Sequence, residues 1–448
     1  MKRFLLFLLD VLSLYGALYL GLIIRYGQDF SVNLSYHLAP FSILFVIWLI
    51  VFFIFDLYEP IYFINDFRFF GRLWKAIVLS GAVSMAFFYL IPFFQIAPRT
   101  NLLIFAIVFT LINLGIRSLF NHLITKTSRN HTILIGLNQQ TLDLAEYLHN
   151  NPQLGYRLDY IVDVDESNFD LKGQSEYFIN IKELREILEK KSPNTIILSP
   201  GAYDVEEVIQ ILYHSLNKKI DIYNLPNFYE QITGKIPLGS ITPEWFLENL
   251  SEGHKKFYDF SKRAFDILAG IIFGLIALPF FGLIALAIKI DSQGAVFYKQ
   301  TRVGRYGQLF TMIKFRTMVQ DAEKGQAIWA KKGDARVTRT GRIFRKFGID
   351  ELPQILNVLR GELSFIGPRS ERPELDKDLE KQIPFYNQRY LVRPGLSGWA
   401  QIQYPHSSSL SDAQQKLQYD LFYLKNRSFF LDFSIFLKTI YTLLTRAV

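Results

Sequence analysis

Four apolar stretches near the start of this chain constrain its fold more than any other feature. They run from Phe4 to Ile24, from Phe41 to Tyr58, from Leu73 to Phe94 and from Leu102 to Leu123. A helix needs about 20 apolar residues to cross about 30 Å of hydrocarbon, and each stretch has roughly that length. The sequence therefore predicts that residues 1–128 form a bundle of four transmembrane helices.

The distribution of basic residues predicts how these helices are oriented, because cytoplasmic loops carry an excess of Lys and Arg. The basic ends carry Lys2, Arg3, Arg68, Arg72, Lys75, Lys126 and Arg129, whereas the loops 25–40 and 95–101 are less basic. We therefore expect the N-terminus and everything after Lys126 to lie in the cytoplasm. The first stretch could instead be a signal peptide, but no small-residue cleavage site follows Gly21, so we interpret it as a retained span.

Two acidic residues, Asp10 and Asp56, lie inside or at the edge of the predicted spans. Acids within a membrane can mark a path for protons or ions. They can also form hydrogen bonds between helices or lie at an interfacial end, and we favour this second interpretation.

The composition narrows the class of function. Of the 448 residues 50% are hydrophobic and only 20% are charged, and the mean hydropathy of +0.16 is high for a soluble protein. The absence of cysteine excludes disulfides, thiolate metal sites and a cysteine nucleophile. The net charge of +8 suits an anionic membrane surface or ligands that carry phosphate. No nucleic-acid-binding motif accompanies that charge, so we expect no nucleic acid as a partner.

Residues 129–224 alternate between strand and helix patterns, which predicts a parallel, Rossmann-like sheet. The predicted strands are 131–136, 158–164, 195–198 and 219–223, and the predicted helices are 141–149, 182–190 and 205–216. A dinucleotide-binding turn needs three glycines, but Gly136-Leu-Asn-Gln-Gln-Thr141 keeps only the first. This domain is therefore degenerate, and we interpret it as structural or regulatory. Residues 225–261, rich in Pro and Gly turns, form a connector.

A fifth apolar run, about 263–290, contains Pro279 in its middle. Proline kinks or breaks a helix. Both flanks are basic, so a simple crossing would place one basic cluster outside the cell, against the orientation rule. We therefore predict a re-entrant helix that enters and leaves the cytoplasmic leaflet, broken at Pro279. The alternative is an ordinary fifth span with a proline kink, which would place the rest of the chain outside the cell.

After Ile290 the chain becomes polar and strongly basic, and four distinctive blocks follow. They are Val296–Met318, Asp334–Arg345, Asp350–Arg369 and Val392–Gln401. In the third block, Asp350 and Glu351 precede Pro353 and an apolar helix pattern, and the positive end of that helix favours ionised carboxylates. Taken alone, this acidic pair could simply cap the helix.

The blocks together predict phosphate chemistry. An ionised Asp can attack phosphorus, and a neighbouring Glu can hold a hard cation through its oxygens. Lys and Arg donate to phosphate groups, and the Arg fork does so in a bidentate manner. The candidate donors in these blocks are Lys314, Arg316, Arg336, Arg345 and Arg369.

These blocks, in this order, resemble the bacterial sugar transferase family, the monotopic phosphoglycosyl transferases. The resemblance covers Lys-Arg-x-x-Asp from Lys262, Lys-Phe-Arg-Thr-Met from Lys314, Asp-x-Arg-x-Thr-x-x-Gly from Asp334 and Asp-Glu-Leu-Pro-Gln from Asp350. It continues in Gly-Pro-Arg up to Arg369 and in Pro-Gly-x-x-Gly-Trp-Ala-Gln up to Gln401. The preceding spans and the degenerate middle domain resemble the large exopolysaccharide-type members, so the resemblance covers nearly the whole chain.

The resemblance implies a two-step transfer of a sugar 1-phosphate from a UDP-sugar to undecaprenyl (polyprenyl) phosphate, with release of UMP. Asp350 would be the nucleophile and form a phosphosugar-aspartyl intermediate, and Asp350 and Glu351 would bind Mg²⁺. We assign phosphate neutralisation to Lys314, Arg316, Arg336 and Arg369 by their places in the motifs. The product would initiate assembly of an exopolysaccharide, capsule or O-antigen type of glycan.

The resemblance also implies the architecture and the setting. We expect an α/β protein with membrane helices: four transmembrane helices in 1–128, a Rossmann-like domain in 129–224, the connector 225–261 and an α-rich catalytic domain in 262–448. The catalytic domain would lie on the cytoplasmic face of the bacterial inner membrane, against the lipid bilayer. The resemblance further favours a homodimer, with downstream glycosyltransferases as additional partners.

The sequence also departs from the family pattern, and rival functions stay open. Leu278 stands where many members have Ser before the proline of the helix break, and the segment after Gln401 differs from the common pattern, which leaves the sugar undetermined. One rival is an NAD-dependent, membrane-linked enzyme that modifies sugar nucleotides through the middle domain. The other is a non-catalytic membrane scaffold of polysaccharide assembly. The glycine-poor turn speaks against the first, and the intact acidic pair speaks against the second.

Overall fold

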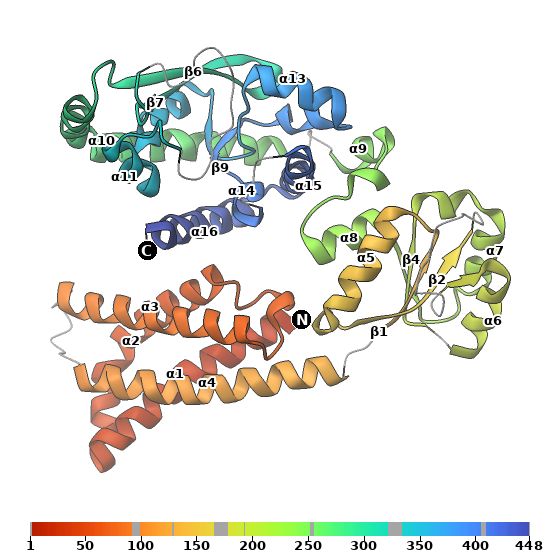
Figure 1. Ribbon diagram of the computed structural model, residues 1–448. Helices are drawn as coiled ribbons and strands as arrows, with labels where there is room; N and C mark the ends of the chain where they lie inside the picture. Colours follow the sequence, from red (N-terminus) through yellow and green to blue (C-terminus); the bar gives the residue numbers. More distant parts are fainter. Residues whose placement is uncertain are drawn as a thin grey trace. The chain divides into compact units, whose positions relative to one another are not determined.

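The computed structural model describes residues 2–91, 99–127, 130–164, 178–191, 193–250, 255–320, 334–404 and 409–447. The chain divides into two compact units, Met1–Leu225 and Pro226–Val448, which we call the amino-terminal and carboxyl-terminal units (Figure 1).

Four long helices begin the amino-terminal unit, as the apolar stretches predict. They are α1 (Lys2–Tyr26), α2 (Phe30–Ile54), α3 (Phe67–Leu90) and α4 (Arg99–Thr127). By length and composition, these helices can cross a membrane. Helix α2 begins earlier than predicted, because it continues through Pro40. A proline removes one backbone hydrogen bond, which neighbouring groups in a helix bundle can replace. The predicted end of the third span, Phe94, lies outside the described residues.

Asp10 joins helices within this bundle, in agreement with the hydrogen-bonding interpretation. Its buried carboxylate accepts a hydrogen bond from Asn113 Nδ2 at 2.8 Å and forms an ion pair with Arg117, both on α4. Arg117 also donates to the Leu57 carbonyl at 2.9 Å. Asp56 pairs with Arg72 of α3 at 3.2 Å. A charge buried among apolar helices is tolerated when it is paired in this way.

A five-stranded, wholly parallel sheet follows in the order β3-β2-β1-β4-β5, which confirms the predicted parallel sheet. Its strands are β1 (Asn130–Ile135), β2 (Tyr156–Asp163), β3 (Phe178–Asn180), β4 (Thr195–Leu198) and β5 (Asp221–Asn224). Its helices are α5 (Gln139–Asn150), α6 (Ile181–Lys191) and α7 (Glu206–His214). The short strand β3 was not predicted, because three residues are too few to show an alternating pattern.

Internal contacts fill the turn after β1. Gly136 has φ +94°, and a Cβ there would overlap the Ser199 side chain. Asn138 caps α5 by accepting a hydrogen bond from the Thr141 amide at 2.8 Å, and the Thr141 hydroxyl donates to the Gly136 carbonyl. The single glycine of this turn therefore serves the packing of Ser199, and the amide at the start of α5 already has a partner.

The carboxyl-terminal unit combines one very long helix, α10 (Lys256–Asp291), with short strands and many helices. Its strands are β6 (Phe297–Val303) and β7 (Leu309–Phe315), which form an antiparallel hairpin, and β8 (Ser364–Ile366) and β9 (Gly395–Ser397), which pair in parallel. Its other helices are α8 (Leu225–Thr233), α9 (Pro243–Asn249), α11 (Arg339–Phe347), α12 (Ile355–Arg360), α13 (Pro373–Gln382), α14 (Trp399–Gln403), α15 (Leu410–Asn426) and α16 (Phe429–Ala447).

The predicted connector is part of this unit's core. Ile236, Ile241 and Trp245 pack in the same buried cluster as Leu417 and Leu421 of α15. The Trp399 indole also donates a hydrogen bond to the Gly234 carbonyl at 3.0 Å. The segment between the sheet and α10 therefore folds with the carboxyl-terminal unit.

Helix α10 contains Pro279 in its interior, so the helical conformation continues through the residue at which we predict the break. Proline removes one hydrogen bond, and the packing of both halves maintains the helix. The first half packs Gly270 against Leu359 of α12, and in the second half Phe281 packs edge-to-face against Phe315 of β7, with ring centroids 5.1 Å apart. Both halves of α10 are therefore held by the same unit.

Candidate active site

The acidic pair lies in a tight turn between two helices. Gly348 ends α11 with φ +70°, and a short 3₁₀ helix, Ile349–Gln354, then leads into α12. Asp350 and Glu351 occupy the first turn of this 3₁₀ helix. The left-handed conformation at Gly348 is readily accessible only to a residue without Cβ, so this glycine sets the direction in which the pair leaves α11.

Two cations hold Glu351. Its Oε1 accepts from Lys314 Nζ at 2.9 Å and from Arg369 at 3.3 Å. Lys314 lies on β7, and Arg369 follows β8, so residues far apart in the sequence converge on one carboxylate. Burial alone would raise the pKa of Glu351, but the charges of Lys314 and Arg369 outweigh it and lower the pKa to about 2. Glu351 is therefore ionised at neutral pH.

Asp350 is more deeply buried, with 8% of its surface exposed. Among the described residues, no other side chain forms a hydrogen bond to its carboxylate. Burial and the charge of Glu351 raise the pKa of Asp350, whereas the charges of Lys314 and Arg345 oppose this rise. The site thus holds one carboxylate that is fixed by two cations and one that is buried beside it.

Arg345 of α11 is a site residue that the motif-based assignment left out. It had been recognised as a candidate phosphate donor, and its charge acts on Asp350. Its Nε donates to the Thr317 hydroxyl at 2.8 Å, which anchors the guanidinium. The signal in the sequence is its position five residues before Asp350, on the helix that leads into the turn.

Two predicted phosphate donors have other partners. Arg316 donates to the carbonyls of Ser292 and Gln293, just beyond the end of α10, and is buried there. Arg336 pairs with Asp334, two residues away. The structure therefore brings Lys314 and Arg369 to the acidic pair and gives Arg316 and Arg336 local roles among the described contacts.

Arg389, which the sequence analysis did not identify, holds the backbone of Arg369. Arg389 donates to the Arg369 carbonyl at 2.9 Å and to the Tyr386 hydroxyl at 2.6 Å. It also pairs with Asp420 of α15 at 2.8 Å, and both partners are buried. This buried pair fixes the backbone from which Arg369 reaches Glu351.

Close backbone contacts between glycines also fix the segment that leads into Arg369. Gly367 donates to the Ser397 carbonyl at 2.8 Å, and Gly395 donates to the Pro368 carbonyl at 2.8 Å. A Cβ on Gly395 would overlap the Gly367 backbone, and a Cβ on Gly398 would overlap the Gly367 carbonyl. The backbones of the Gly-Pro-Arg and Pro-Gly-x-x-Gly motifs therefore pass in close contact with each other, and this contact positions Arg369.

The residues present fit a hard divalent cation. No side chain in the described part of the chain donates a hydrogen bond to the Asp350 carboxylate or to Glu351 Oε2, so oxygen ligands are available. Among the described residues, no group of three or more His, Cys, Asp or Glu residues gathers into a metal-binding cluster. Mg²⁺ is commonly bound by one or two carboxylates together with substrate phosphates, and this donor set matches that pattern.

Comparison with known proteins finds a match between residues 257–446 and the bacterial sugar transferase family. A protein of Aeromonas hydrophila named UDP-N-acetylgalactosamine-undecaprenyl-phosphate N-acetylgalactosaminephosphotransferase is 40% identical over 50% of this chain and 53% of its own length. A UDP-glucose:undecaprenyl-phosphate glucose-1-phosphate transferase of Xanthomonas campestris is 30% identical over 72% of this chain and 69% of its own length. The match to an exopolysaccharide production protein of Rhizobium leguminosarum, 38% identical, covers 96% of that relative but 41% of this chain.

Proposed function

Because this chain belongs to the bacterial sugar transferase family, we propose that it transfers a sugar 1-phosphate from a UDP-sugar to undecaprenyl phosphate. The similar proteins of Aeromonas and Xanthomonas are named for this type of transfer, with different sugars. The observation that carries the proposal is the buried Asp350 carboxylate, which has no side-chain hydrogen-bond partner and lies beside Glu351 and the charges of Lys314 and Arg345.

The chemistry proceeds in two displacements at phosphorus. An Asp350 oxygen attacks the sugar-bearing phosphate, the bond to the bridging oxygen breaks, and UMP leaves with that oxygen. An oxygen of undecaprenyl phosphate then attacks the phosphosugar-aspartyl group, which releases Asp350 and forms undecaprenyl-diphosphate-sugar. Covalent catalysis lets one site serve a soluble and a lipid substrate in turn.

The neighbouring residues prepare Asp350 for this role. Burial strips water from the carboxylate, which makes nearby charges act more strongly on it. Lys314, Arg345 and Arg369 supply positive charge where phosphate oxygens would lie. Asp350 and Glu351 would hold Mg²⁺, which neutralises phosphate charge when it is bound. Glu351 also keeps Lys314 and Arg369 in place before the substrate arrives.

The packing of α10 supports a position of this site at the membrane surface. Exposed apolar side chains cover the helix between its two anchored ends, among them Leu268, Leu275 and Leu283. Arg263 near one end donates to the Val358 carbonyl, and Asp291 at the other end accepts from the Thr340 amide. Both ends of α10 contact the same unit, which favours a helix that enters and leaves one side of the membrane over a helix that crosses it. We infer a re-entrant helix, with the unit on the cytoplasmic face.

The test uses the full chain in nanodiscs with undecaprenyl phosphate, Mg²⁺ and a panel of UDP-sugars, and it measures UMP release. A UDP-sugar labelled at the sugar-bearing phosphate should leave label on the protein when the lipid acceptor is omitted. Asp350→Asn should abolish this label. Lys377→Gln, which removes an exposed charge on α13, is the matched control and should label normally. Unchanged labelling of Asp350→Asn would exclude Asp350 as the nucleophile.

A further inference from the structure

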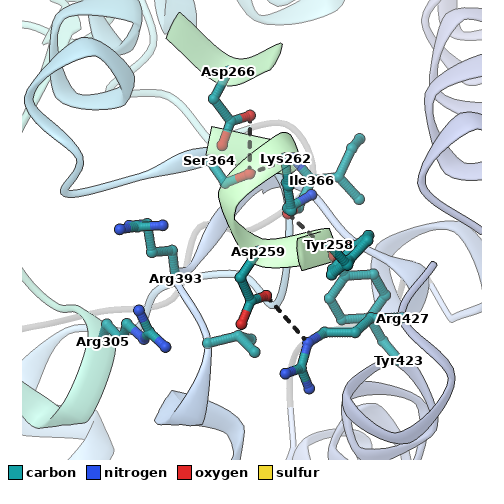
Figure 2. Close-up of a pocket in the computed structure, with 11 residues that line it drawn as sticks. Tyr258, Asp259, Lys262, Asp266, Arg305, Ser364, Ile366, Arg393, Tyr423 and Arg427 are labelled. Atoms are coloured by element: carbon teal, nitrogen blue, oxygen red, sulfur yellow. Dashed lines mark hydrogen bonds and ion pairs between the residues drawn. The ribbon is translucent and has the colours of Figure 1, made fainter. Parts of the chain in front are cut away.

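A second charged pocket lies in the carboxyl-terminal unit, at the start of α10 (Figure 2). It is a small cavity of about 20 Å³ that is partly open to solvent. The first turns of α10, strand β8 and the segment before β9 line it, together with the end of α15. None of Lys314, Asp350, Glu351 or Arg369 lines it, so it is separate from the acidic pair.

The pocket carries four cations, and two of them have carboxylate partners. Lys262 pairs with Asp432 at 2.5 Å, and Arg427 pairs with Asp259 at 3.6 Å.

Arg305 and Arg393 form no ion pair with any described residue. Each uses only its Nε, which donates to the Leu391 carbonyl at 3.2 Å and to the Gly361 carbonyl at 3.1 Å, respectively. Figure 2 shows both guanidinium groups on the same side of the pocket. The two outer nitrogens of each guanidinium are therefore available to a ligand.

The two free guanidinium groups also repel each other. Burial lowers the pKa of Arg393, and the charges of Arg305 and Arg263 lower it further, whereas the charges of Asp266 and Asp259, which also line the pocket, oppose this shift. An anion between the two side chains would remove this repulsion. A phosphate group matches the fork geometry of arginine and can accept from the outer nitrogens of a guanidinium group.

Exposed aromatic side chains place the pocket at the level of lipid headgroups. Phe257 and Phe260, on the first turns of α10, are 78% and 75% exposed. Tyr306, next to Arg305, is also exposed, and its ring lies under the Arg305 guanidinium at 4.6 Å. Aromatic residues gather where the apolar core of a bilayer meets its headgroups.

We propose that this pocket binds the phosphate group of an anionic lipid at the bilayer surface, through Arg305 and Arg393. The phosphate could belong to a phospholipid headgroup or to a polyprenyl phosphate, which share this chemistry. The site does not depend on the proposed reaction, because it involves neither Asp350 nor Glu351. It does share strand β8 with the reaction site: Ile366 lines the pocket, and Arg369, three residues later, contacts Glu351.

The test measures how fast phenylglyoxal modifies individual arginines of the full chain in nanodiscs, with peptide mass spectrometry as the readout. Four preparations are compared: phosphatidylcholine alone, phosphatidylcholine with phosphatidylglycerol, with undecaprenyl phosphate, or with inorganic phosphate in solution. We expect a lipid-borne phosphate to slow modification of Arg305 and Arg393 several-fold. Arg185, an exposed arginine on α6, is the internal reference and should react equally in all four.

Variants separate binding from folding and from catalysis. Arg393→Gln should remove the protection of Arg305, with its thermal unfolding checked in parallel. Asp259→Asn should strengthen protection at low phosphatidylglycerol content, because it deletes an acid from the lining of the pocket. Asp350→Asn should keep full protection, so a failure of the proposed reaction would leave this result intact.

The results identify the lipid that supplies the phosphate, and some of them would overturn the proposal. Protection by phosphatidylglycerol identifies a phospholipid site, and protection by undecaprenyl phosphate identifies an acceptor site. Equal reactivity in all four preparations overturns the proposal. Protection by inorganic phosphate alone also overturns it, since the lipid would then have no part. Weaker protection in Asp259→Asn would contradict the electrostatic reasoning.

Discussion

The charge of Lys314 should set the pH at which Asp350 becomes reactive. The difference between the ordinary glutamate pKa of 4.5 and the value of about 2 for Glu351 corresponds to about 3 kcal/mol of net attraction. Lys314, at 2.9 Å, is the closer of the two cations that hold Glu351, and its charge also lowers the pKa of Asp350. Lys314→Met should therefore raise the pKa of both carboxyl groups.

The direction in which activity changes with pH follows from the ionisation of Asp350. Asp350 attacks only when it is ionised, so the rate falls as the pH drops through its pKa, which burial and Glu351 already raise. Removing Lys314 should move this acid limb to higher pH, because its charge lowers the pKa of Asp350. Lys314→Arg keeps the charge and should leave the limb near its original position.

The assay is the pH dependence of kcat/KM for UMP release, because this quantity reports the pKa values of the free enzyme. Each variant is compared with its own plateau, so that a general loss of rate does not hide the shift. Thermal unfolding at the same pH values controls for acid instability. An acid limb that stays in place in Lys314→Met, or that moves equally in Lys314→Arg, would refute the electrostatic argument.

Three further outcomes are expected. Gly395→Ala should destabilise the carboxyl-terminal unit by several kcal/mol in thermal melts, since its Cβ overlaps backbone, whereas Gly282→Ala, with open space, should not. Asp10→Ala should cost about 3–5 kcal/mol because it leaves Arg117 charged and buried, and Arg117→Met in the same chain should restore part of the loss. The stability supplied by Glu351 should be complete above about pH 4.5 and decline toward pH 2, a decline that chemical unfolding should not show in Glu351→Gln.

The sequence predicted the elements whose signal is long or repeated. Spans of about 20 apolar residues and a regular alternation of strands and helices depend on composition over many residues, which single contacts do not disturb. Helix α2 shows the limit: the apolar stretch begins at Phe41, but the helix begins at Phe30 and continues through Pro40. Helix α10 likewise continues through Pro279.

The sequence identified the acidic pair but not the full set of groups around it. Lys314 and Arg369 reach Glu351 as their motif positions imply. Arg316 and Arg336 carry equally strong motif signals, yet nearby carbonyls and Asp334 hold them, because local partners compete with distant ones. Arg389 has no signal at all in one sequence, since its importance lies in the Arg369 carbonyl that it supports.

The anchoring of α10 at both ends has a consequence for how the protein is built. A membrane-embedded helix whose two ends are attached to one folded unit fixes the depth of that unit in the membrane and limits its tilt. In the re-entrant arrangement that we propose, the reaction site would keep its depth in the membrane without the first 225 residues. We expect that a chain beginning at Pro226 would still sediment with membranes. The amino-terminal unit would then be free to serve a role other than membrane attachment.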